Sequence, residues 1–226
     1  KPVSWDESAG NCMVIQIPLF IYPAPQRKRI YLAGCRGEVK VRWMLYAAAL
    51  LAACTPPPEP PQLSRGTLLP SPKPLLDFTL TDHTGAAFTR SSLTDGWTFA
   101  FFGYTHCPDV CPTTLASLVQ LRRQLEATMP SGELPGTVFI SVDPERDTPE
   151  QLAEFMPYFH PEFLGVTGDE EQILTVTRQL GILHAKAEDA GADDYLVDHS
   201  AAIILFDPDG AFHAVFGVPH DPAAMA

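Results

Sequence analysis

The feature that most constrains the fold is the run WTFAFFGY at residues 97–104, which is apolar at almost every position. A strand that faces solvent on one side alternates apolar and polar residues, whereas a nearly continuous apolar run is typical of a strand buried on both faces. Such a strand needs helices packed over its sheet. The next residues agree, because Pro112 suits the first turn of a helix and apolar residues recur at helical spacing as far as Met129. The sequence therefore predicts an α/β domain.

Further strands and helices alternate along the chain. Thr148 and Gln151 have the spacing of a capping box, Pro149 suits the first helical position, and Gly181 is placed to end a later helix. The predicted strands cover residues 77–80, 87–89, 97–104, 137–142, 163–166, 201–206 and 212–216, and the predicted helices cover residues 112–129, 149–159 and 169–180. The first two strands form an N-terminal β-hairpin. This order predicts a sandwich with a central mixed sheet flanked by helices. A cysteine pair between the first buried strand and its helix makes it thioredoxin-like.

The residues upstream have the pattern of a secretory signal. Lys40 and Arg42 provide a basic start, residues 43–53 are apolar, and Cys54 follows. The apolar stretch is too short to span a bilayer, which takes about 20 residues. Residues 51–54, LAAC, resemble a bacterial lipobox, so we expect Cys54 to be lipidated and to anchor the protein to a membrane. The alternative is an ordinary signal peptide cut nearby, with Cys54 incidental.

These patterns divide the chain into four segments. We expect residues 1–38 to be a non-native upstream extension, because they mix proline, basic and apolar residues without a clear period. Residues 39–53 are the predicted lipoprotein-type signal segment. Residues 54–74 are rich in proline and predict an extended tether. Residues 75–226 are the predicted folded domain, in which we expect the C-terminal helix to be truncated.

The charge of the chain excludes some functions. The formal net charge is −12, with 15 lysines and arginines against 27 aspartates and glutamates. Binding to nucleic acid needs a basic stripe that neutralises phosphates, and adsorption to anionic lipid also needs positive charge. We therefore expect no nucleic-acid partner, and a membrane contact only through the lipid anchor.

The chemistry of the domain centres on three residues. Cys107 and Cys111 are spaced C-x-x-x-C, and His199 lies far downstream. Two thiolates and one imidazole suit a soft ion such as Cu(I) and leave the site open enough to pass the ion on. The same thiols can instead close a disulfide, especially in the oxidising compartment of an exported protein. We also expect the dipole of the following helix to favour the Cys111 thiolate.

Neighbouring polar residues leave alternatives open. Asp198 either orients the His199 imidazole from outside the ligand set or is a solvated carboxylate. Asp143 either lines the site or caps the turn at Pro144. His106 is interpreted as a solvated loop residue. No arrangement that suggests ligation is found for the remaining histidines, which are His83, His160, His184, His213 and His220.

Three ordered motifs, FFGYTHCPDVCPTTL, ISVDPERDTPEQL and VDHSAAIILFDPDG, resemble those of the Sco/SenC family over residues 75–218. The resemblance implies a thioredoxin-like copper chaperone that delivers copper to the dinuclear copper centre of cytochrome c oxidase during assembly. The implied ligands are Cys107, Cys111 and His199, for Cu(I) or alternatively Cu(II). The implied partners are the copper-site subunit of the oxidase and other periplasmic copper chaperones. With Cys54 as the lipid anchor, the implied location is the periplasmic face of a bacterial cell envelope. The departures from the family pattern lie at the two ends of the chain.

The main alternative function is that of an enzyme. A thiol-disulfide oxidoreductase would reduce the cysteines of the oxidase copper site or of another exported protein. Reductases of the thioredoxin type use C-x-x-C with a facing cis-proline, whereas this chain has C-x-x-x-C and places Asp198-His199-Ser200 in the facing loop. This difference favours a metal-binding chaperone over an enzyme. A peroxidase lacks an activating Thr and Arg around Cys107, and structural zinc needs four ligands.

Overall fold

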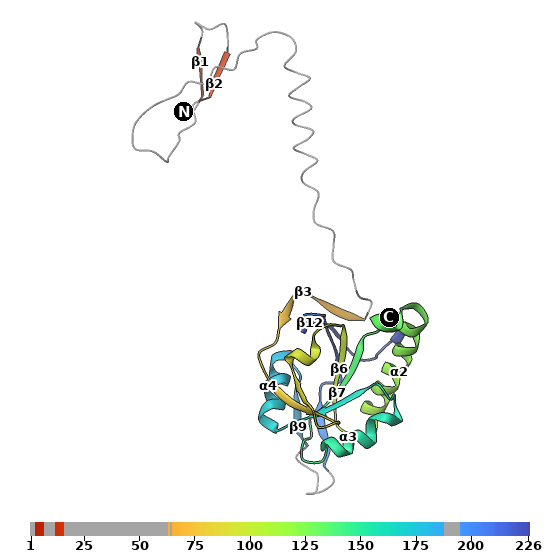
Figure 1. Ribbon diagram of the computed structural model, residues 1–226. Coiled ribbons are helices and arrows are strands. Elements are labelled where there is room, and N and C mark those ends of the chain that lie inside the picture. The colour runs from red at the N-terminus through yellow and green to blue at the C-terminus, as the bar shows by residue number, and fades with distance from the viewer. Residues whose placement is uncertain (1–2, 7–11, 16–62, 64, 188–194) are drawn as a thin grey trace. The chain divides into compact units, whose positions relative to one another are not determined.

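The structure is a computed structural model that describes residues 3–6, 12–15, 63, 65–187 and 195–226 (Figure 1). The chain forms two units, residues 1–59 and residues 60–226. The predicted signal segment and Cys54 lie outside the described residues. Among the helices that are described, none is both long and apolar enough to cross a bilayer.

Among its described residues, the first unit contains one short ladder. Strand β1 (Val3–Asp6) pairs antiparallel with β2 (Cys12–Ile15). This ladder lies within residues 1–38, where the sequence analysis found no clear period. The sequence VSWD of β1 does alternate apolar and polar residues, which is a strand signal confined to too few positions to stand out.

The second unit is built on an eight-stranded mixed sheet with the order β3-β12-β11-β6-β7-β8-β4-β5. Its strands are β3 (Gly66–Pro74), β4 (Thr79–Asp82), β5 (Ala87–Thr89), β6 (Thr98–Gly103), β7 (Gly136–Ser141), β8 (Leu164–Thr167), β11 (Ile203–Phe206) and β12 (Ala211–Phe216). The pairs β6–β7 and β7–β8 are parallel and the other pairs are antiparallel. The predicted mixed sheet is confirmed, and the predicted hairpin is the β4–β5 pair.

Helices cover the sheet as the apolar run requires. They are α2 (Val110–Thr128), α3 (Pro149–Phe155), α4 (Glu170–Leu180) and α5 (Pro222–Met225), with 3-10 turns η2 (Arg90–Leu93), η3 (Ser131–Glu133) and η4 (Met156–Tyr158). In Figure 1, α4 lies on one side of β6 and β7 and α2 lies on the other. Every residue of β6 is buried. The predicted central strand is therefore confirmed, and the domain is an α/β sandwich of the thioredoxin-like class.

Part of the predicted tether is a strand, β3, in the structure. Residues 66–74 were assigned to a proline-rich linker, but they form the edge strand that pairs with β12, for example Leu68 with Ala214. Proline cannot donate to a ladder, yet it is tolerated on an edge strand, where its missing N–H can face solvent. The prolines of β3 therefore do not prevent it from pairing, and the sheet begins nine residues before the predicted boundary at Leu75.

A second difference is a separate two-stranded sheet. Strand β9 (His184–Lys186) pairs antiparallel with β10 (Val197–His199), and neither belongs to the central sheet. Both strands are only three residues long, so the alternation that would have predicted them is too short to recognise. His199 therefore lies on a small hairpin of its own, which becomes important for the site.

The C-terminal end of α4 gives a stability prediction. Gly181 ends the helix with φ 71°, in the left-handed region, and nothing lies within 4 Å of an added Cβ. Gly181→Ala should therefore cost about 1 kcal/mol from backbone strain alone. The unfolding temperature should fall by roughly 2–4 °C, measured by circular dichroism. Gly96→Ala is the control, because Gly96 also has open space but an ordinary φ. Equal effects of the two substitutions would contradict this account.

Candidate metal centre

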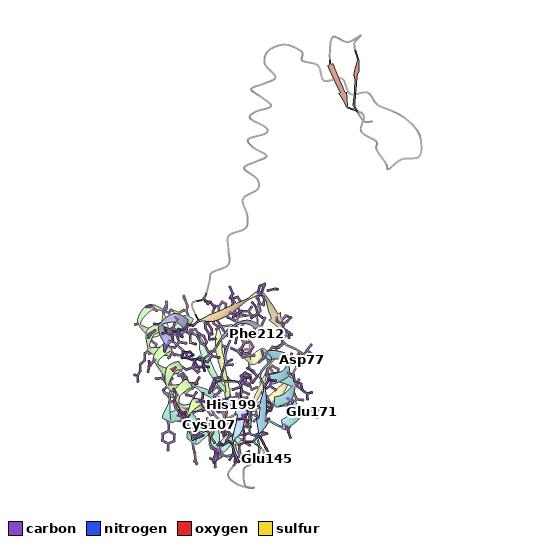
Figure 2. All side chains as sticks on the ribbon, turned by 180° about the vertical axis from the view of Figure 1, so that it is seen from behind. Asp77, Cys107, Glu145, Glu171, His199 and Phe212 are labelled. Carbon is purple, nitrogen blue, oxygen red and sulfur yellow. The ribbon has the colours of Figure 1, made fainter. Side chains whose placement is uncertain are left out.

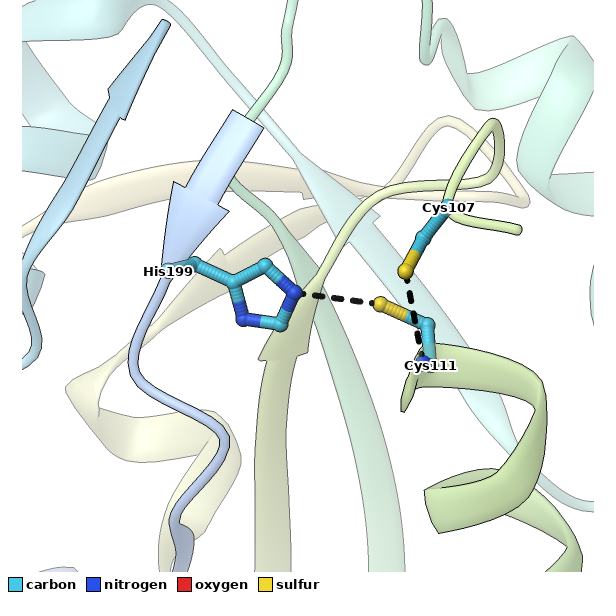
Figure 3. A group of neighbouring side chains, drawn as sticks. All are labelled: Cys107, Cys111 and His199. Atoms are coloured by element: carbon cyan, nitrogen blue, oxygen red, sulfur yellow. Dashed lines mark hydrogen bonds between the residues drawn. The ribbon is translucent and has the colours of Figure 1, made fainter. Parts of the chain in front are cut away.

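Three donor atoms from three segments meet at one end of the sheet. Cys107 lies in the loop after β6, Cys111 is the second residue of α2, and His199 ends β10 (Figure 3). The two sulfur atoms and the imidazole nitrogen all lie within 4.8 Å of one another. The Cys111 Sγ lies 3.2 Å from His199 Nε2, and the backbone amide of Cys111 donates to Cys107 Sγ at 3.4 Å. The structure thus brings together the three residues that the sequence predicted as ligands.

The two thiols differ in their surroundings. Cys111 is fully buried, whereas Cys107 is half-buried. Burial raises the pKa of the Cys111 thiol, because a thiolate is poorly solvated in the protein interior. Burial therefore outweighs the expected stabilisation of the Cys111 thiolate by the helix dipole. The amide at the start of α2 points at Cys107 Sγ instead.

His199 is prepared to act as a neutral nitrogen ligand. Burial lowers the pKa of its imidazole, so the ring is uncharged at neutral pH. Its Nδ1 lies 3.3 Å from the Ser200 carbonyl oxygen, which leaves Nε2 facing Cys111. The rings of Phe101 and Tyr104 pack against the imidazole with centroid distances of 6.1 and 5.8 Å. These contacts hold the ring in one orientation and exclude water from one side.

The neighbouring residues resolve several open alternatives. Asp198 is exposed, and no hydrogen bond among the described residues joins it to His199. Consecutive strand residues point to opposite faces, so Asp198 and His199 face opposite ways, which favours the alternative of a solvated carboxylate. His106 is exposed, as interpreted from the sequence. His184 is the cross-strand partner of His199 but does not belong to the group of donor atoms.

Asp143 neither lines the donor group nor acts only as a turn cap. Its side chain is 1% exposed and accepts hydrogen bonds from Arg146 Nε and Tyr195 Oη, both at 2.6 Å. Its backbone carbonyl also accepts from the amide of Asp147 at 3.0 Å, which closes the turn. The carboxylate is therefore part of a buried polar cluster beside the site.

Sequence reasoning missed two residues that support the site. Gly103 ends β6, and a Cβ at this position would lie 2.7 Å from Cys111 Sγ. Asp147 is fully buried and accepts hydrogen bonds from Thr105 and Ser141. Burial raises the pKa of the Asp147 carboxyl group, although these hydrogen bonds oppose the shift. The available signals were the one glycine inside a run of large apolar residues and a second aspartate in the motif SVDPERD.

Comparison with known proteins identifies a family. The SCO1/SenC family model matches residues 71–226. The mitochondrial SCO2 homolog of Bos taurus is 45% identical over 136 residues, which are 60% of this chain and 51% of the bovine protein. The chain spans about half the length of the curated relatives it matches.

Solved structures agree in fold. The crystal structure of Arabidopsis thaliana ScoI with copper bound has a TM-score of 0.62 and 38% identity, and the match covers 67% of this chain and 92% of ScoI. BsSco has a TM-score of 0.54 and 25% identity over 69% of this chain and 90% of its own. It is described as a member of the Sco family of cytochrome c oxidase assembly proteins, with a disulfide switch.

Proposed function

Because this chain belongs to the SCO1/SenC family, we propose that it is a copper chaperone that delivers copper to the dinuclear copper centre of cytochrome c oxidase during assembly. The observation that carries the proposal is the meeting of Cys107, Cys111 and His199 donor atoms within 4.8 Å. Soft thiolates with imidazole suit Cu(I), and copper is present in the related ScoI structure.

The arrangement also suits transfer of the ion. Three donors leave Cu(I) open to a further thiolate from a partner protein. Cys107 is the more exposed of the two cysteines, so a partner's thiolate reaches the ion on that side. Copper then passes by ligand exchange, in which each incoming sulfur replaces one of the three ligands. The buried Cys111 is released last, because access to it requires the other ligands to move.

Copper stoichiometry tests the proposal. The full chain should bind one Cu(I), with sulfur and nitrogen donors visible by X-ray absorption spectroscopy. Cys107→Ala should lose most of this binding, since it removes one of the two soft ligands. A chain that binds no copper under reducing conditions would refute the chaperone function.

The buried thiol predicts how binding depends on pH. Cys111 remains protonated at neutral pH because its pKa is raised, so copper must displace that proton. His199 is already neutral above its ordinary pKa of 6.5 and releases none. Since a proton is released on binding, the apparent affinity for Cu(I) should rise by about tenfold per pH unit from Cys111 alone. Competition with a Cu(I) chelator between pH 7 and pH 8.5 measures the slope. An affinity that is independent of pH would contradict a protonated Cys111.

A second candidate function is thiol-disulfide exchange. Cys107 and Cys111 are both free thiols, and their sulfur atoms lie within 4.8 Å of each other. A disulfide switch is described for the related BsSco. The oxidoreductase would use the same cysteines without the imidazole, which makes His199 the residue that separates the two functions.

We further propose that the domain is tethered in a cell envelope through a lipid on Cys54. The support is the order of basic residues, apolar stretch and LAAC at residues 51–54. Mass spectrometry of the mature N-terminus tests the proposal, because lipidation adds the mass of acyl chains to Cys54. An unmodified N-terminus beyond Cys54 would indicate an ordinary signal peptide.

A further inference from the structure

The two halves of the metal site belong to different parts of the fold. Cys107 and Cys111 follow β6 of the central sheet, whereas His199 belongs to the separate β9–β10 sheet. No backbone ladder among the described residues joins these two sheets. The pairing of β11 with β6 brings the two halves near each other, because β11 begins four residues after His199. Contacts outside the sheets must then fix the remaining distance between the sulfur and nitrogen donors.

One turn, with a buried aspartate at each end, contacts both halves. It has the sequence DPERD at residues 143–147, follows β7, and is called the DPERD turn here. The Asp147 amide donates to the Asp143 carbonyl at 3.0 Å, which closes the turn. Figure 2 shows Glu145 of the turn at the same end of the domain as Cys107 and His199.

The cysteine half is held by Asp147. Its carboxylate accepts from the Thr105 amide at 2.9 Å and from the Thr105 hydroxyl at 2.5 Å. Thr105 lies two residues before Cys107, in the loop where the Cys107 amide donates to the Tyr104 carbonyl at 3.3 Å. Because Asp147 is fully buried, water does not compete for these bonds. The carboxylate therefore fixes the start of the cysteine loop.

The histidine half is held by Asp143 and Arg146. The Arg146 guanidinium lies 3.7 Å from the centre of the Tyr195 ring and donates to the Tyr195 carbonyl at 2.9 Å. The Tyr195 hydroxyl donates to the Asp143 carboxylate at 2.6 Å. Tyr195 lies two residues before β10, so these contacts hold the strand that carries His199.

Ser141 connects the two sets of contacts. Its hydroxyl donates to Asp147 at 2.6 Å and accepts from the Asp143 amide at 3.1 Å. We propose that the DPERD turn positions the two halves of the copper site separately, with Asp147 setting the sulfur donors and the Asp143–Arg146 pair setting the nitrogen donor. None of these residues belongs to the donor group, so they act as positioning residues. The inference rests on the proposed copper-binding function.

Two conservative variants test the two halves. Arg146→Lys keeps the positive charge but lacks the planar fork that bonds both Asp143 and Tyr195. Asp147→Asn keeps the size but replaces one acceptor oxygen with a donor. Each should weaken Cu(I) binding by the factor of about 10–100 that is typical for residues that orient metal ligands. X-ray absorption spectroscopy, which reports the donor atoms around copper, should then distinguish the two variants. We expect the nitrogen donor to be lost in Arg146→Lys and sulfur donors to be lost in Asp147→Asn.

Matched substitutions elsewhere control for general destabilisation. Arg122→Lys alters an arginine of similar exposure that bonds Glu126, and Asp207→Asn alters a buried turn aspartate that accepts from the Ala211 amide. Both should leave the copper donors unchanged. If Arg146→Lys and Asp147→Asn unfold the domain, Tyr195→Phe and Thr105→Val provide milder tests. Tyr195→Phe removes only the hydroxyl that bonds Asp143 and Glu145, and Thr105→Val removes only the hydroxyl that bonds Asp147 and His106.

The outcomes distinguish the inference from the proposed function. Loss of different donor types in the two halves supports separate positioning. Variants that melt at a lower temperature but bind copper with unchanged sulfur and nitrogen donors would overturn it, because a structural role alone predicts that result. A wild-type chain without copper would instead overturn the proposed function on which the inference rests.

Discussion

Replacing His199 by alanine should abolish copper delivery and leave thiol-disulfide exchange nearly intact. The substitution removes the imidazole that lies 3.2 Å from Cys111 Sγ and leaves only two sulfur donors. Loss of a residue that merely orients a ligand typically costs 10–100-fold in metal affinity, so loss of a ligand itself should cost more than about 100-fold. We expect the cysteines to remain in place, because they lie after β6 and in α2, outside the β9–β10 hairpin that carries His199.

Three measurements on the same variant decide the matter. Competition with a Cu(I) chelator gives the affinity, transfer to an oxidase copper-site fragment gives delivery, and reduction of a disulfide-bonded peptide gives exchange. His184→Ala is the matched control, since His184 lies directly opposite His199 on the β9–β10 hairpin and outside the donor group. Equal loss of delivery and exchange in His199→Ala would mean that the two functions share this residue. Equal copper affinities for the two variants would remove His199 from the ligand set.

The central part of the fold was predictable because its sequence patterns extend over many residues or depend only on neighbouring residues. The apolar run at residues 97–104 is interrupted at so few positions that only a buried strand fits, and β6 lies there. Gly181 and Thr148 mark helix ends through backbone chemistry that depends on their immediate neighbours alone. Signals of this kind can be recognised without any knowledge of tertiary contacts.

The elements that were missed depend on distant partners. β3 is a strand because β12 offers it an edge, and its prolines argue against a strand when the sequence is read alone. Likewise, β9 and β10 are too short to show a period. The sequence left the role of Asp198 open, because it did not show that Asp198 lies on a strand whose adjacent residues face opposite ways.

The pKa of Cys111 also depends on tertiary contacts that the sequence does not show. A helix N-terminus favours a thiolate, and this local rule predicted a lowered pKa for Cys111. The structure buries Cys111 fully and directs the Cys111 amide at Cys107 Sγ, so burial outweighs the dipole. A buried thiol with a raised pKa suits a copper-binding site, because a bound cation compensates the thiolate charge that burial disfavours.

Gly103→Ala should damage the fold and the site together. The added Cβ would lie 2.7 Å from Cys111 Sγ and 2.9 Å from Phe139 Cε2, which is closer than real contacts allow. Both neighbours are fully buried, so neither can move into solvent. Overpacking of this kind typically costs about 1–3 kcal/mol of unfolding free energy. If the Cys111 sulfur is displaced, it also moves away from the His199 imidazole. We therefore expect copper affinity to fall by at least about tenfold.

A double-mutant cycle separates the collision from other effects of the new methyl group. If the collision with sulfur dominates, Gly103→Ala should cost less in a Cys111→Ala background, with a coupling energy of about 0.5–3 kcal/mol from denaturant unfolding. Gly136→Ala in the adjacent strand β7 is the control, since its Cβ would meet nothing closer than 3.4 Å. Additive effects in the cycle would assign the damage to Phe139 instead. In that case copper affinity would stay close to that of the wild type, because the sulfur would not have moved.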